Sequence, residues 1–72
     1  MGESLSELVE ANDLVGVRGW LDTRPPYVIA DELARLDGVR AGVPFRLLAK
    51  DRALTVFEEL EPVDQQAILL GL

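Results

Sequence analysis

An internal repeat constrains the fold of this chain more than any other feature. Residues 25–48 and 49–72 align without a gap. A unit of this length cannot bury its apolar face alone, so repeats of this kind usually stack and cover one another. Seven aligned pairs keep their chemical type: Leu33 and Phe57, Leu36 and Leu60, Asp37 and Glu61, Val39 and Val63, Val43 and Ala67, Phe45 and Leu69, and Leu48 and Leu72.

The spacing of the apolar residues is helical throughout, and no β-branched or aromatic run alternates over six positions. We therefore expect one all-α domain over residues 1–72, with five to six helices. Residues 25–48 and 49–72 are predicted to form two helical hairpins, and residues 1–24 a terminal hairpin that matches their register poorly. The predicted architecture is a short superhelical stack of hairpins, similar to armadillo repeats.

Capping residues mark where several helices should begin. Ser4 and Glu7 fit the capping-box pattern, in which each side chain accepts a backbone N–H of the other residue. Asp13 and Asp37 are candidate N-caps, because a short acidic side chain can accept the free N–H groups of a first turn. These positions predict helices that start just after residues 4, 13 and 37.

The prolines give further boundaries. Pro26 and Pro62 suit the first position of a helix, where the missing N–H would be unpaired in any case. Pro44 lies inside a helical pattern, where a proline kinks or breaks a helix. The sequence therefore predicts a short turn at 38–42 and a helix that starts near Pro44.

Composition excludes several classes of function. The net charge of −6 argues against a nucleic-acid partner, which needs a basic face. The chain has no histidine and no cysteine, and no base is placed beside its serines, so we expect no enzyme activity. No segment approaches the ~20 apolar residues that cross a bilayer, and no signal peptide is recognisable. We expect a cytoplasmic location without membrane insertion by this chain.

Four acidic residues near the C-terminus are the candidate metal ligands: Glu58, Glu59, Glu61 and Asp64. Magnesium prefers carboxylate oxygens and retains several waters, so weak Mg²⁺ binding is one interpretation and no tightly bound cofactor is expected. The other interpretation is a solvated face whose acids complement the dipole of the last helix. Both interpretations remain open at this point.

The chain ends on an apolar segment that has no polar residue after it. The segment is apolar on nearly every side. Its candidate partner-binding residues are Ile68, Leu69 and Leu72. We expect either a second copy of the chain to cover them or the helical array to continue in a longer protein.

A sequence motif in the last hairpin adds a family resemblance. Residues 47–72 resemble the hairpin repeat in the cytosolic N-terminal domain of MgtE-type magnesium transporters. The upstream segment 10–21 is similar to the opening segment of that domain, so the resemblance covers about residues 5–72. The matching positions are Leu47, Leu48, Lys50, Arg52, Ala53, Val56, Phe57, Leu60, Pro62 and Gln65, with Asn12, Asp13, Leu14, Arg18 and Leu21 upstream.

The resemblance implies a fold and a function. It implies a right-handed superhelical bundle at the cytoplasmic face of the inner membrane. There it would be a regulatory module that senses magnesium and controls channel opening. Ions would bridge its acidic face to CBS modules and hold the pore closed. The alternative is a metal-independent α-solenoid that binds a protein partner.

Overall fold

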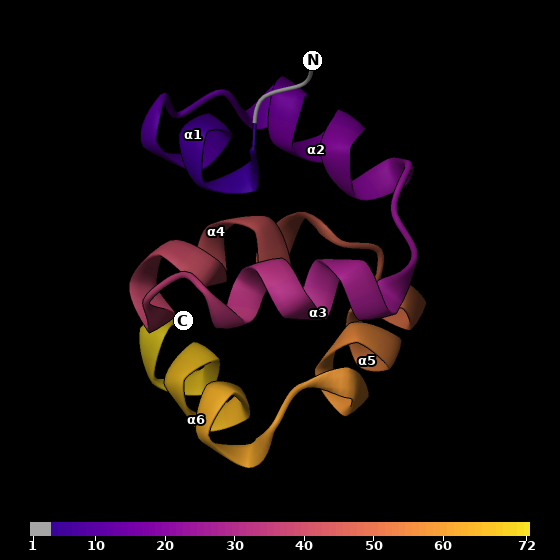
Figure 1. Cartoon of the computed structure of the whole chain (residues 1–72), viewed down its shortest axis with the longest axis vertical. Helices are drawn as coiled ribbons and strands as arrows, with labels where there is room; N and C mark the ends of the chain where they lie inside the picture. Colours follow the sequence, from indigo (N-terminus) through magenta and orange to yellow (C-terminus); the bar gives the residue numbers. More distant parts are fainter. Residues whose placement is uncertain (1–3) are drawn as a thin grey trace.

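A computed structural model describes residues 4–72, which form helices joined by short turns (Figure 1). No strand occurs among residues 4–72, which confirms the predicted all-α class. Of the predicted terminal hairpin 1–24, residues 1–3 lie outside the described residues. The helices are α1 (Leu5–Glu10), α2 (Leu14–Asp22), α3 (Pro26–Ala34), α4 (Gly38–Leu47), α5 (Lys50–Glu59) and α6 (Pro62–Gly71).

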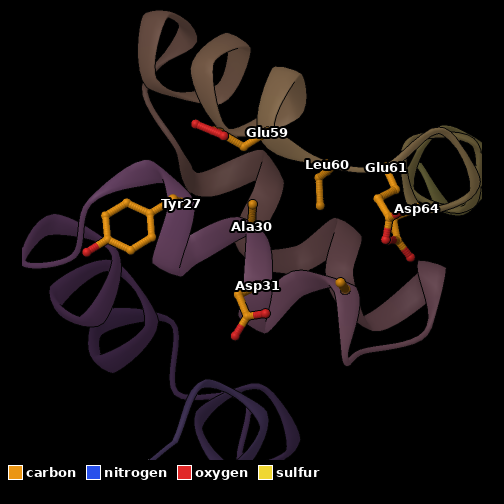
Figure 2. A pocket seen from close by; sticks show the side chains of 8 residues that line it. Tyr27, Ala30, Asp31, Glu59, Leu60, Glu61 and Asp64 are labelled. Atoms are coloured by element: carbon orange, nitrogen blue, oxygen red, sulfur yellow. The ribbon is translucent and has the colours of Figure 1, made fainter.

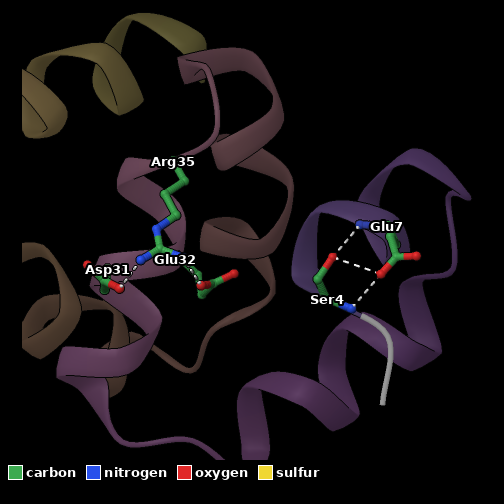
Figure 3. A network of polar contacts seen from close by, with 5 residues as sticks. All are labelled: Ser4, Glu7, Asp31, Glu32 and Arg35. Atoms are coloured by element: carbon green, nitrogen blue, oxygen red, sulfur yellow. Dashed lines mark hydrogen bonds and ion pairs between the residues drawn. The ribbon is translucent and has the colours of Figure 1, made fainter. Parts of the chain in front are cut away.

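Side-chain caps start three of the helices as predicted. At α1 the backbone N–H of Ser4 donates to the Glu7 carboxylate at 3.0 Å, and the N–H of Glu7 donates to the Ser4 hydroxyl at 3.3 Å (Figure 3). Asp13 and Asp37 cap α2 and α4, and each accepts the N–H three residues ahead at 2.9 Å. The capping box and both N-caps are therefore confirmed, and each satisfies N–H groups that a helix start leaves free.

The prolines confirm two boundaries and correct a third. Pro26 and Pro62 are the first residues of α3 and α6. The turn predicted at 38–42 is wrong, because α4 runs from Gly38 to Leu47 with Pro44 inside it. The Pro44 ring is fully buried, and Ala41 is buried one turn earlier. Core packing of these residues offsets the ~3 kcal/mol that an internal proline costs.

The helix pairs lie in layers along the longest axis of the molecule (Figure 1). The α1–α2 pair lies at one end, α3 and α4 in the middle, and α5 and α6 at the other end. Helix α3 packs against α5, α4 against α6, and α2 against α4. The first residues of α3 and α5 are aligned positions of the sequence repeat, and so are the first residues of α4 and α6. The superhelical character of this arrangement remains a prediction.

One hydrophobic core runs through all the layers. Each of the six described helices or the turn after it contributes at least one buried side chain to this core. Each large aliphatic side chain in such a core stabilises the fold by about 1.5–3 kcal/mol. The core residues are Leu5, Leu8, Val17, Trp20, Leu21, Ile29, Ala30, Leu33, Ala41, Val56, Leu60 and Ile68.

Glycines allow α4 and α6 to approach closely. A Cβ atom at Gly38 would collide with the carbonyl oxygen of Ala67, and one at Gly71 would collide with the carbonyl oxygen of Gly38. A Cβ at Gly42 would sit 3.4 Å from the Leu72 side chain. Backbone therefore meets backbone between these helices, and a larger residue at either end of the contact would force them apart.

Arginine side chains connect layers that are distant in sequence. Arg52 on α5 donates to the main-chain oxygens of Leu21, at 2.9 Å, and Arg24, at 2.6 Å, at the C-terminal end of α2. The guanidinium of Arg24 in turn lies 4.6 Å from the centre of the Trp20 ring. These contacts satisfy carbonyl groups that the end of a helix leaves without an intrahelical partner.

Candidate functional site

A pocket of about 170 Å³ opens between α3 and the turn that joins α5 to α6 (Figure 2). Three of the four acidic residues predicted as metal ligands line it, together with residues of α3. Helix α3 packs against α5, so residues far apart in the sequence face the same space. The lining residues are Tyr27, Ala30, Asp31, Ala34, Glu59, Leu60, Glu61 and Asp64.

The turn after α5 places the acidic side chains. Helix α5 ends at Glu59, and Leu60 is buried with an extended backbone (ψ 149°), so the chain reverses direction there. Glu61 is the N-cap residue of α6, although its side chain makes no capping hydrogen bond, and Asp64 lies in the first turn. Both carboxylates thus stand at the positive end of the α6 dipole. This position is the one expected if the two carboxylates stabilise α6 through its dipole.

The opposite wall of the pocket comes from α3. Tyr27 is largely exposed, and Asp31 forms an ion pair with Arg35 at 3.1 Å (Figures 2 and 3). Arg35 also pairs with Glu32 at 3.2 Å. Within residues 4–72, by contrast, Glu59, Glu61 and Asp64 take part in no ion pair. The uncompensated negative charge of the pocket therefore lies on its α5–α6 side.

The predicted magnesium ligands are only partly brought together. Glu59, Glu61 and Asp64 share the pocket, whereas Glu58 is exposed on α5 and is not one of the described residues that line it. No group of three or more acidic side chains within residues 4–72 is close enough to hold a metal ion. Weak magnesium binding by these residues remains a prediction.

Two of the three predicted partner-binding residues are exposed, and the third is buried. Leu69 is 59% exposed and Leu72 is half exposed, but Ile68 is only 2% exposed and belongs to the core. Ile68 faces inward because α6 packs against α4. Leu54 on α5, which sequence reasoning missed, is 61% exposed. Val63 and Leu70 of α6 are exposed as well, whereas the Leu72 side chain lies beside Gly42 of α4. We call Leu54 and Leu69, one on each helix of the last layer, the end-face residues.

The alignment of the two repeat units explains why Leu54 is exposed. Leu54 aligns with Ala30, which is 5% exposed on the helix that packs against α5. Leu69 likewise aligns with Phe45, which is half buried with its ring centre 6.0 Å from that of Phe57. The last layer thus exposes apolar residues at positions that the middle layer keeps covered.

Two polar residues of the motif that resembles the MgtE hairpin repeat donate hydrogen bonds to main-chain oxygens near helix ends. Arg52 binds the main-chain oxygens at the end of α2, and the side-chain amide of Gln65 donates to the main-chain oxygen of Phe57 at 2.7 Å. Pro62 begins α6, and the side chains of Val56 and Leu60 are buried. In this chain the motif residues therefore have structural roles that the fold itself explains.

Comparison with known proteins adds no family assignment. No family model, curated protein or solved structure matches the chain. Within residues 4–72, no helix has both the length and the apolar character that a membrane crossing requires.

Proposed function

We propose that this chain is a protein–protein interaction module, built as a short superhelical stack of helical hairpins in the cytoplasm. The observation that carries the proposal is the exposure of Leu54 and Leu69 on the last layer. Their aligned counterparts, Ala30 and Phe45, lie in the middle layer and pack toward the α5–α6 layer. Exposed apolar side chains that form a continuous patch mark interaction sites on soluble proteins.

The finer description of the fold as a stack has its own support. Helices two apart in the chain pack together, α3 with α5 and α4 with α6, and the two members of each pair start at aligned positions of the repeat. Contacts between corresponding helices of successive units are what a stack of hairpins requires. In such an array the last unit presents the surface that the next unit or a partner would cover.

Photo-crosslinking in cells tests the interaction module. A photoreactive amino acid replaces Leu54 or Leu69 in the full chain, and Val15, which is 85% exposed on α2 at the opposite end, gives the matched control position. We expect light-dependent products at positions 54 and 69, formed with the same partner, and no such product at position 15. Absence of any product at both end-face positions would contradict the proposal.

A second candidate function follows from the acidic pocket. We propose as the alternative a regulatory module like the N domain of MgtE-type transporters, in which magnesium links this surface to CBS modules. The supporting observation is that Glu59, Glu61 and Asp64 share one pocket and form no ion pair within residues 4–72. Hard divalent cations prefer such carboxylate oxygens.

Amide chemical shifts separate the two candidates. Millimolar magnesium chloride should move the resonances of Glu59, Glu61 and Asp64 more than sodium chloride of equal ionic strength, if the pocket binds the ion. The matched control is the same titration on a chain with Glu59→Gln, Glu61→Gln and Asp64→Asn. Equal responses to the two salts would reject magnesium sensing by the isolated chain and leave the interaction module.

A further inference from the structure

We draw no further inference here: the strongest candidate, the hollow between the start of α4 and the end of α6 that Val39, Ala67 and Leu70 help to line, carries nothing because nothing in the structure shows what covers it.

Discussion

The guanidinium of Arg52 donates a hydrogen bond to the main-chain oxygen of Leu21, 2.9 Å away and 31 positions earlier in the sequence. A second bond of 2.6 Å reaches the oxygen of Arg24. Carbonyl groups at a helix C-terminus carry partial negative charge, so a cation placed there is favourable. One side chain thus connects the last layer of the molecule to the end of α2 in the first.

Loss of this side chain should destabilise the fold. We expect Arg52→Ala to lower the free energy of unfolding by about 2 kcal/mol, because two charge-assisted hydrogen bonds to main-chain oxygens are lost. Arg35→Ala is the matched control and should cost less than about 0.5 kcal/mol, since its ion pairs are exposed. Urea unfolding followed by circular dichroism measures both. Equal losses in the two variants would contradict the role assigned to Arg52.

Replacement of glycine by alanine should have opposite effects at two positions, because Gly71 lies in the close contact between α4 and α6 and Gly19 lies on α2 in open space. Gly71→Ala should lower the free energy of unfolding by about 1–3 kcal/mol, because the new Cβ would collide with the Gly38 carbonyl oxygen and force the helices apart. Gly19→Ala meets nothing within 4 Å and should stabilise α2 by up to about 1 kcal/mol. Thermal unfolding compares the two. A stabilising Gly71→Ala would show that α4 and α6 do not meet through backbone.

The capping box of α1 predicts a dependence of stability on pH. The hydrogen bond from the Ser4 backbone N–H, aided by the Ser4 hydroxyl, holds the pKa of Glu7 below its ordinary value of 4.5. A carboxyl group whose pKa is lower in the folded state stabilises the fold above its unfolded pKa. This contribution disappears as the pH falls through the folded pKa.

The matched variant for this effect is Glu7→Gln, which keeps a hydrogen-bond acceptor but does not titrate. We expect the wild type to have the higher melting temperature above pH 4.5, and the difference to shrink as the pH falls below that value. Carbon-detected NMR of the Glu7 carboxyl group gives its pKa directly, which should rise in Ser4→Ala. A difference in melting temperature that does not change with pH would refute this assignment.

The turn between α1 and α2 requires a residue whose backbone adopts the left-handed conformation, with a positive φ. Asn12 has φ 56°, a region that asparagine tolerates better than most residues and that glycine adopts freely. Asn12→Ala should therefore lower the free energy of unfolding by about 1 kcal/mol, whereas Asn12→Gly should be neutral or slightly stabilising. Denaturant unfolding distinguishes them, and equal stabilities would argue against a left-handed residue at this turn.

Local sequence signals predicted most of the helix boundaries. Ser4, Asp13 and Asp37 act on backbone groups within three residues, and Pro26 and Pro62 fix their own torsion angles, so their effects do not depend on the rest of the fold. The prediction at Pro44 is wrong because the cost of this proline is offset by packing in a core that no local pattern describes. Secondary structure follows from neighbours in sequence only where the core does not override them.

Only part of the candidate site could be predicted from the sequence, because tertiary packing brings the other part to it. Glu59, Glu61 and Asp64 are close in sequence, so their proximity could be anticipated. Tyr27 and Asp31 enter the pocket only because α3 packs against α5. The partners of Arg52 were likewise beyond any local signal, since the bonds join α5 to the end of α2. The exposure of Leu54 follows from its alignment with Ala30 only once the structure shows that α5 covers Ala30.

Trp20 is the single tryptophan of the sequence, and it lies almost buried beneath the guanidinium of Arg24. The main-chain oxygen of Arg24 is the one that Arg52 holds. The indole therefore stands at the joint between the N-terminal and C-terminal halves of the molecule, and its emission should respond when that joint loosens. The protein carries an intrinsic optical reporter there, and opening of this junction can be followed by fluorescence without attaching any dye.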